Sequence, residues 1–413
     1  MELQQRILAL IARGVATPTT DEEFDRLARE IFTFQFERCE PYRAYCEYLK
    51  KTPTSVAHWK EIPAVPTSAF KEFALTCFSA AEAVAEFHTS GTTRAKSGKH
   101  FFATLELYEA AIRIGFAENL LADHGEVNGQ DAHSTKEPET TGGPFDPTQG
   151  RRRPPIQVRQ NIRLPMMVLT ASPEEARHSS LSHMMGVVMR EFGADDSAFY
   201  VEGGQLMVEK LVQDLCEAQW AHQPVFLLGT AFAFVHLFDH LAEKNLKFDL
   251  SPESRAMETG GFKGRSRELA KTDLYALFEK FLGIPSARVV NEYGMTELST
   301  QFYDLTPQMG RQTNVKQAPP WARVLIIDPN SGREAANNER GLIRVCDLAN
   351  LWSMVCVQTE DLGIKRTAND GKRDARPTGR TGTETTADGF EVLGRVAGAE
   401  VRGCSLNAED LKI

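Results

Sequence analysis

Residues 287–297 read ARVVNEYGMTE, an apolar run that passes directly into a polar loop containing a glycine. Three apolar runs of the same kind precede it, and a helical pattern separates each run from the next. The earlier runs are MMVLT (166–170), VFLLGT (225–230) and RAMETGG (255–261), and the helical patterns cover 173–192, 231–245 and 266–282. Strands that alternate with helices predict an α/β fold with a mostly parallel sheet and helices on both of its faces.

The two ends of the chain differ from this central region. Residues 1–50 carry two amphipathic helical patterns, with Thr20 placed to cap the second, and a further helix is expected at 104–122. After residue 320 the strands RVLIID, GLIRVCD and FEVLGR follow one another without long helices. We therefore expect a large α/β domain over 1–320, a β-rich subdomain over 321–393 and a short C-terminal segment over 394–413.

Two polar stretches interrupt these domains. Residues 124–160 and 366–389 are rich in Gly, Pro and charged residues and lack apolar periodicity. Such segments cannot bury enough apolar surface to offset the entropy lost on ordering. Both are predicted to be mobile surface insertions.

Composition excludes several classes of protein. The 413 residues are 42% hydrophobic and 25% charged with a net charge of -9, and no basic stripe is present, which argues against nucleic-acid binding. Seven cysteines without a CxxC pair indicate neither a zinc ribbon nor a disulfide framework. No signal peptide and no long apolar run is evident, so we expect a cytoplasmic protein that is not transmembrane.

One segment has the composition of a phosphate-binding loop. It consists of Thr89, Ser90, Gly91, Thr92 and Thr93. Small residues let backbone N–H groups approach a phosphate closely, and hydroxyl groups add hydrogen-bond donors. The GxxxxGK[ST] pattern of a Walker A loop is missing. A simple Ser/Thr turn is the alternative reading of this segment.

The opening stretch supplies a second candidate site. Its residues are Glu292, Tyr293, Gly294, Met295, Thr296 and Glu297. Ligands of open α/β sheets bind at the carboxyl ends of the strands, where this segment lies. Glu297 there could hold Mg²⁺, which prefers oxygen ligands, and Tyr293 offers a flat face for a base. The alternative is a polar loop with a stacking tyrosine.

Together these segments resemble the phosphate loop and the adenine- and magnesium-binding motif of the adenylate-forming superfamily, which includes acyl-CoA synthetases. Further segments resemble the remaining superfamily motifs, in the expected order. They are the acyl-site motif Ser182–Gly186 with His183, the adenine-side glycines Gly260 and Gly261, the ribose-binding Asp361 in Thr359–Asp361, and the hinge motif Gly394-Arg395. The resemblance implies that these residues bind ATP or AMP, and that His183 lines the acyl site.

The phrases SPEEARHSSLSHMMG, ETGGFKGRSREL, NEYGMTELSTQFYD and GRVAGAEVRGCSL are more closely similar to one family. This is the long-chain acyl-protein synthetase family of the bacterial bioluminescence fatty-acid reductase complex, and the similarity covers roughly 20–413. It implies that ATP and Mg²⁺ activate a fatty acid, that the acyl group moves to Cys404, and that a partner acyl-thioester reductase receives it. Arg402 is placed to lower the pKa of the Cys404 thiol.

The sequence departs from the superfamily pattern at two places. The phosphate loop usually continues Gly-x-Pro-Lys, whereas here Lys96 and Lys99 are both candidates for that lysine and the sequence does not choose between them. The chain also ends ten residues after Gly403, so the C-terminal subdomain of acyl-CoA synthetases and its catalytic lysine are not expected. A thioester still needs a thiolate nucleophile, and an internal cysteine would provide one.

Two rival functions stay open at this stage. One is an acyl-CoA ligase of the phenylacetate-CoA ligase type, which the short C-terminus disfavours. The other is a non-catalytic acyl-binding scaffold, which the intact Glu297 and Asp361 disfavour. Neither the length of the acyl chain nor the identity of the partner follows from the sequence.

Overall fold

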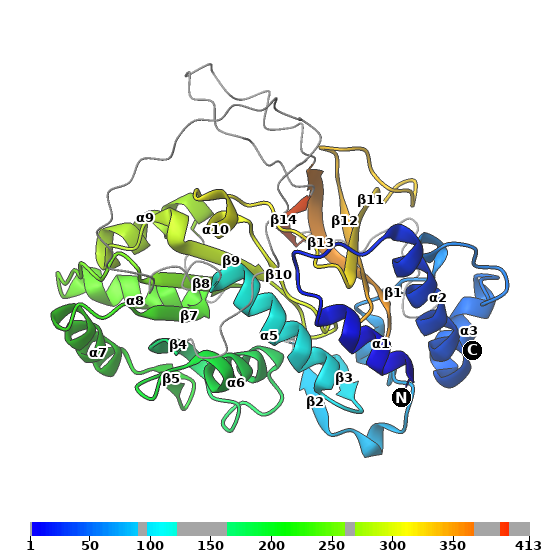
Figure 1. The fold of residues 1–413 in the computed structure, drawn as a ribbon, viewed down its shortest axis with the longest axis horizontal. Helices are drawn as coiled ribbons and strands as arrows, with labels where there is room; N and C mark the ends of the chain where they lie inside the picture. The colour runs from blue at the N-terminus through cyan, green and yellow to red at the C-terminus, as the bar shows by residue number, and fades with distance from the viewer. Residues whose placement is uncertain (1, 90–96, 122–162, 261–268, 367–388, 396–413) are drawn as a thin grey trace, which may run out of the picture.

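The computed structural model describes residues 2–89, 97–121, 163–260, 269–366 and 389–395, and its largest sheet has seven strands (Figure 1). The strand order is β10-β9-β8-β7-β4-β5-β6. The five strands from β9 to β5 run parallel, and β10 and β6 pair antiparallel at the two edges. Their bounds are β4 Met166–Ala171, β5 Ala198–Glu202, β6 Gln205–Leu206, β7 Phe226–Thr230, β8 Arg255–Thr259, β9 Val289–Tyr293 and β10 Phe302–Tyr303. The predicted mostly parallel sheet is confirmed.

Helices cover both faces of this sheet because its strands are apolar on both sides. Met167 and Leu169 of β4 pack into one core with three helices, α7 Val208–Trp220, α8 Ala231–Glu243 and α9 Lys271–Leu282. Met166 and Val168 point to the opposite face and pack with α5 Glu106–Leu120 and α6 Ser180–Phe192. Alternate residues of one strand thus enter two different cores, as the pleat requires.

A second sheet lies beside the first and carries the C-terminal strands (Figure 1). Its order is β1-β13-β12-β11, and β14 also pairs with β13. The bounds are β1 Val65–Pro66, β11 Ala322–Ile327, β12 Arg340–Asp347, β13 Cys356–Arg366 and β14 Gly389–Arg395. Because β13 is eleven residues long, its first half pairs with β1 and its second half with β14.

The N-terminal helices share a core with this second sheet. They are α1 Glu2–Ile11, α2 Asp21–Arg38 and α3 Glu40–Tyr48. Gln35 of α2 is fully buried and donates to the carbonyl groups of Asn350 and Leu351. Segments on both sides of residue 320 therefore contribute to one core. The division of the chain into three domains stays a prediction.

The remaining elements are short and mostly connect the two sheets. They are η1 Trp59–Glu61, α4 Ala69–Glu72, η2 Ala80–Glu82, β2 Ala85–His88, β3 Lys99–Phe102, η4 Ser286–Arg288 and α10 Thr306–Met309. The strands β2 and β3 form an antiparallel hairpin whose connection contains the predicted phosphate loop.

Several sequence-based boundaries differ from the structure. Residues 1–50 form three helices instead of two, because the chain is extended at Cys39 and Pro41 then starts a new helix. The helix predicted over 173–192 begins only at Ser180, where the Ser179 side chain caps it, and the one predicted over 266–282 begins at Lys271. Strand β13 was missed because its polar and apolar residues do not alternate regularly. The two predicted insertions lie almost wholly outside the described residues.

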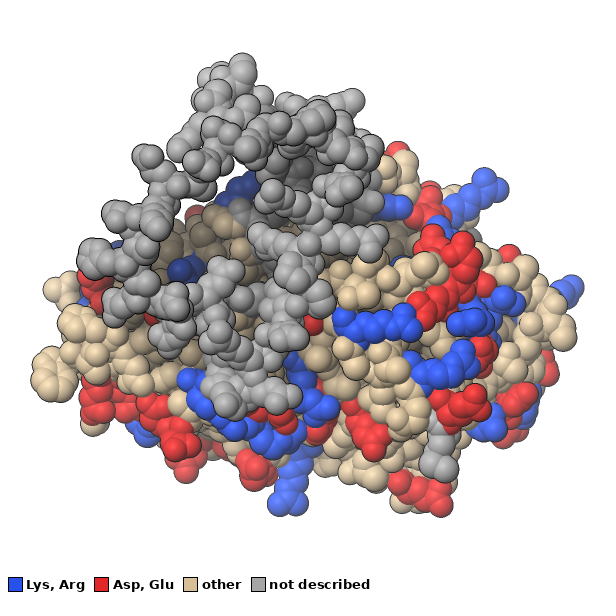
Figure 2. Space-filling view, in the orientation of Figure 1, with Lys and Arg blue, Asp and Glu red and all other residues tan. Residues whose placement is uncertain are grey.

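Among the described residues, no helix combines the length and hydropathy needed to cross a membrane. Figure 2 shows Lys and Arg interspersed with Asp and Glu over the visible face, without a continuous basic field. This mixed surface agrees with the net charge of -9.

Candidate active site

The predicted adenine-side segments lie next to each other at the carboxyl ends of β8 and β9. Thr259 and Glu292 are direct partners in the parallel ladder, and the Thr259 hydroxyl donates to the Glu292 carboxylate. Gly260 follows with a φ of +73° and open space where a side chain would stand. A positive φ is accessible to glycine at little cost, so the backbone here can turn away from the strand and stay uncovered. Gly261 lies outside the described residues.

Three predicted ligand-binding residues from distant parts of the chain meet beside this edge. The Tyr293 hydroxyl donates to Oδ2 of Asp361 at 2.9 Å. Asp361 on β13 faces Arg395 on β14 in the ladder, and the Arg395 Nε lies 3.6 Å from Oδ1 of Asp361. Strand pairing in the second sheet thus holds the predicted ribose-binding carboxylate against the end of the first sheet.

Glu297 is the predicted magnesium ligand, and it is buried next to the same group. Its side chain is only 6% exposed, and burial raises the pKa of its carboxyl group to about 7. The Arg395 guanidinium opposes this rise, whereas the charges of Asp361 and Glu360 add to it. A desolvated carboxylate beside other acids would gain from a cation, and one or two carboxylates together with phosphates commonly hold Mg²⁺. The donor chemistry of Glu297 therefore fits the ion.

Thr296 joins the loop before Glu297 to the elements on the other side of the site. Its hydroxyl donates to the His88 carbonyl at 3.3 Å and lies 3.1 Å from the Ser180 hydroxyl at the start of α6. Its carbonyl accepts from Nδ1 of His100 at 2.7 Å. His100 is fully buried, and burial lowers the pKa of its imidazole to about 4, so the ring stays neutral. The loop is therefore fixed to both strands of the β2–β3 hairpin.

His183, predicted to line the acyl site, lies one helical turn after Ser180. Its Nε2 donates to Glu109 at 3.2 Å, and its ring stacks on Tyr108 and contacts Phe87. Burial lowers the pKa of His183, while the Glu109 carboxylate opposes that shift. The residue is a half-buried, hydrogen-bonded histidine in an aromatic wall.

The predicted phosphate loop is described only at its base. The Thr89 N–H donates to the Gly98 carbonyl at 2.9 Å, and the Gly98 N–H donates to Oγ1 of Thr89 at 2.9 Å. Lys99 pairs with Glu86 at 2.7 Å, and this ion pair lowers the pKa of Glu86. The residues between, Ser90, Gly91, Thr92, Thr93 and Lys96, lie outside the described residues.

The sequence analysis did not identify the residues that hold the loop after Glu297 through hydrogen bonds. Asp347, at the end of β12, accepts from the Ser299 backbone N–H at 2.9 Å and from the Thr300 hydroxyl at 2.7 Å. Asn350 donates to the Glu297 carbonyl at 2.8 Å. Both are polar residues inside the apolar stretch VCDLANLWSMVC, which is the signal that could have identified them.

A buried charged group beneath β9 was also missed. Lys316 is 1% exposed and donates to the side-chain and backbone oxygens of Asn291. Burial lowers the pKa of Lys316 to about 8, and burial raises that of Glu292 to about 7. Lys316 also exchanges two backbone hydrogen bonds with Phe390, the second residue of β14. It therefore connects the end of the parallel sheet to the strand that carries Arg395.

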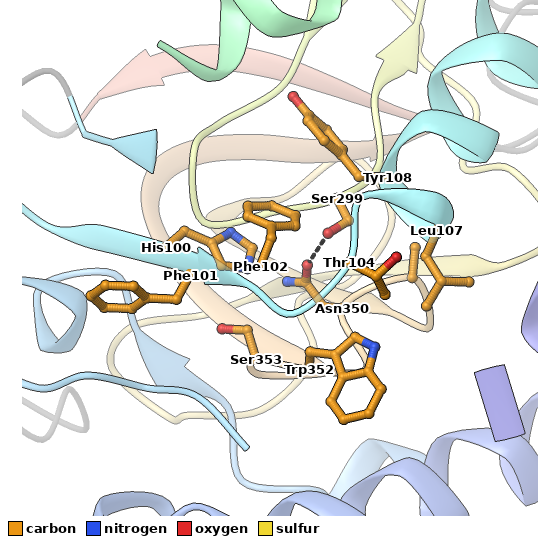
Figure 3. Close-up of a pocket in the computed structure, with 11 residues that line it drawn as sticks. His100, Phe101, Phe102, Thr104, Leu107, Tyr108, Ser299, Asn350, Trp352 and Ser353 are labelled. Atoms are coloured by element: carbon orange, nitrogen blue, oxygen red, sulfur yellow. Dashed lines mark hydrogen bonds between the residues drawn. The ribbon is translucent and has the colours of Figure 1, made fainter. Parts of the chain in front are cut away.

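A small pocket lies between the hairpin, α5 and the Asn350 loop (Figure 3). Its empty space is about 230 Å³ with the open solvent at its mouth included. Ser299 and Asn350 line it and are joined by a hydrogen bond of 2.5 Å. Ligand pockets usually measure roughly 300–1,000 Å³, so this pocket alone does not house a long acyl chain.

The arrangement of the two sheets is the fold of a class of proteins, the adenylate-forming ligases. The backbone resembles two structures of 2-hydroxyisobutyryl-CoA ligase. One is an open conformation in complex with 2-HIB-AMP and CoA (TM-score 0.57, 15% identity, 94% of this chain and 72% of that chain). The other is the postadenylation state in complex with 2-HIB-AMP (TM-score 0.56, 16% identity, 93% and 70%).

The particular family follows from the sequence comparison. The family described as "Acyl-protein synthetase, LuxE" matches residues 158–411, and the chain belongs to this family of ligases. Two relatives are named long-chain-fatty-acid–luciferin-component ligase. The protein of Aliivibrio fischeri is 22% identical over 82% of this chain and 78% of its own, and that of Vibrio harveyi is 21% identical over 92% and 86%. The resemblance inferred from the motifs is confirmed.

Proposed function

We propose that this ligase uses ATP to activate a long-chain fatty acid as an acyl-adenylate and transfers the acyl group to its own Cys404. A partner protein of the acyl-thioester reductase type then receives it. The observation that carries the proposal is the meeting of Tyr293, Asp361, Arg395 and Glu297 at the carboxyl end of β9. The names of the two bacterial relatives support the long-chain fatty acid as substrate.

In the first half-reaction, a fatty-acid carboxylate oxygen attacks the α-phosphorus of ATP. A P–O bond forms, the bond to the β-phosphate breaks, and pyrophosphate leaves with the electron pair. Tyr293 would stack on the adenine, Asp361 would bind the ribose hydroxyls, and Arg395 would hold the Asp361 side chain in position. Mg²⁺ held by Glu297 would neutralise charge on the phosphates when bound.

In the second half-reaction, the thiolate of Cys404 attacks the acyl carbon and AMP leaves, so that a carbon–sulfur bond replaces a carbon–oxygen bond. Cys404 lies within the range matched by the family but outside the described residues. Five of the six described cysteines are buried, and burial raises the pKa of the Cys46 thiol to about 12, which opposes thiolate formation. Among the described residues only Cys216, on α7, is an exposed thiol and a rival acceptor.

The experiment compares the wild type with Cys404→Ser, and Cys216→Ser is the matched control. Each protein is incubated with Mg²⁺, ATP and a radioactive long-chain fatty acid. Wild type and Cys216→Ser should retain label that neutral hydroxylamine releases, whereas Cys404→Ser should not. All three should catalyse fatty-acid-dependent exchange between ATP and pyrophosphate, because that exchange reports only the first half-reaction.

The alternatives give different results. If label is lost from Cys216→Ser instead, the acceptor is wrongly assigned. If no protein is labelled but acyl-CoA forms when CoA is added, the chain is an acyl-CoA ligase. If no exchange occurs with any fatty acid, the non-catalytic scaffold replaces the proposal.

A further inference from the structure

Two buried cysteines face each other on neighbouring strands of the second sheet, and neither is the proposed acyl acceptor. Cys346 on β12 and Cys356 on β13 are direct ladder partners, and their Sγ atoms lie 2.8 Å apart. Both are free thiols and are 2% and 3% exposed.

The backbone between them suits a covalent bond. The Asp347 N–H donates to the Val355 carbonyl at 2.7 Å. Asp347 and Val355 lie next to the cysteine pair, so the hydrogen bond of this antiparallel ladder falls beside the two cysteines and not between them. Cys346 and Cys356 are then a non-hydrogen-bonded pair, whose Cα atoms are about 4.5 Å apart. Disulfides span roughly 4.4–6.8 Å between Cα atoms, so the bond can form without moving the strands or breaking a ladder hydrogen bond.

We propose that Cys346 and Cys356 form a reversible dithiol–disulfide site. With a diazene oxidant, the two S–H bonds break, one S–S bond forms, and the two electrons and two protons reduce N=N to HN–NH. A dithiol reductant reverses the step. The site is independent of the proposed acyl transfer, which uses a different cysteine.

Burial sets the rate at which this site responds. Burial and the adjacent Cys356 raise the pKa of the Cys346 thiol well above its usual range, so little thiolate is present at neutral pH. Oxidation is therefore expected to be slow in the folded protein. A low concentration of urea should accelerate it by opening the strands locally.

The site is next to the support of the proposed catalytic loop. Asp347 directly follows Cys346 and holds Ser299 and Thr300 through its carboxylate. A bond between the two strands would fix the end of β12 beside this residue. Because this disulfide closes a short loop, it should raise the midpoint temperature of thermal unfolding by about 3 °C.

The sequence offers a direct test. Trypsin cuts after Arg344 and Lys365, and the peptide between them contains both cysteines and no others. Full-length protein is treated with the diazene, the remaining thiols are alkylated, and the digest is analysed by mass spectrometry. Wild type should yield this peptide unalkylated and about 2 Da lighter than its dithiol form, with the alkylated form restored by prior reduction.

Single variants separate this pair from other thiols. Cys346→Ala and Cys356→Ala should each lose both the mass change and the oxidant-dependent rise in thermal midpoint. Cys46→Ala, which removes a buried thiol of the same core, should keep both. The proposal is overturned if the wild-type peptide remains doubly alkylated after prolonged oxidation in low urea, or if Cys46 is found bonded to either cysteine. Because the readout needs neither ATP nor fatty acid, it is unaffected if the acyl-transfer proposal fails.

Discussion

Replacing Glu297 by glutamine should stabilise the ligand-free protein at alkaline pH while it removes activity. Burial raises the pKa of Glu297 from 4.5 to about 7. Because the pKa of Glu297 is higher in the folded state than in the unfolded state, the contribution of this group to the free energy of unfolding is fully present below pH 4.5. That contribution is lost as the pH rises through 7. The ionised carboxylate then lowers the free energy of unfolding.

The magnitude follows from the shift. The difference between the unfolded-state pKa of 4.5 and the folded-state pKa of about 7 lowers the free energy of unfolding of the wild type by about 1 kcal/mol at pH 5 and about 3 kcal/mol at pH 8. Glutamine does not ionise, so the free energy of unfolding of Glu297→Gln relative to wild type should rise by about 2 kcal/mol between these two pH values. Any fixed cost of burying the amide cancels in that difference.

The assay is urea unfolding of both proteins at pH 5 and pH 8 without nucleotide. Glu360→Gln removes a charge that adds to the raised pKa of Glu297, so this comparison variant should reduce the pH dependence of the wild type without abolishing it. The same Glu297→Gln protein should lose ATP–pyrophosphate exchange by roughly 2–4 kcal/mol of transition-state stabilisation, as expected for one electrostatic group. If the two proteins differ equally at both pH values, the carboxylate does not titrate as its burial requires. If exchange is unchanged, the magnesium role is wrong.

Three further changes test the packing of the site and the fold. Gly294→Ala places a Cβ against the Glu292 carboxylate, and relief of that overlap should lower the free energy of unfolding in urea by about 1–3 kcal/mol. An unaltered urea midpoint would contradict the close approach of Gly294 to Glu292. Tyr293→Phe removes the hydrogen bond to Asp361 and should raise KM for ATP roughly fivefold, or about 1 kcal/mol, with a smaller change in kcat. Equal affinity in steady-state kinetics would mean that the tyrosine hydroxyl does not orient the carboxylate. Thr20→Ala removes the N-cap of α2 and should lower the free energy of unfolding by about 1 kcal/mol without affecting exchange; loss of exchange at full stability would be inconsistent with a purely structural cap.

The sequence by itself determined the class of fold and named the segments of the candidate site. Short apolar runs such as MMVLT and VFLLGT are typical of strands buried on both faces, and each is followed by a helical pattern. The motif containing Tyr293 and Glu297 was also identified from the sequence, because its residues lie within a few positions of each other. A motif whose residues are close together in the sequence can be identified without knowledge of the tertiary structure.

Only the tertiary structure decided which distant residues meet. Asp361 reaches Tyr293, 68 residues earlier in the chain, because the second sheet packs beside the end of the first. Lys316 and Asp347 looked like ordinary polar residues, yet burial among specific partners turns them into supports of the site. Their environment is created by long-range packing, and it is that environment which sets the pKa values of Glu292 and Glu297.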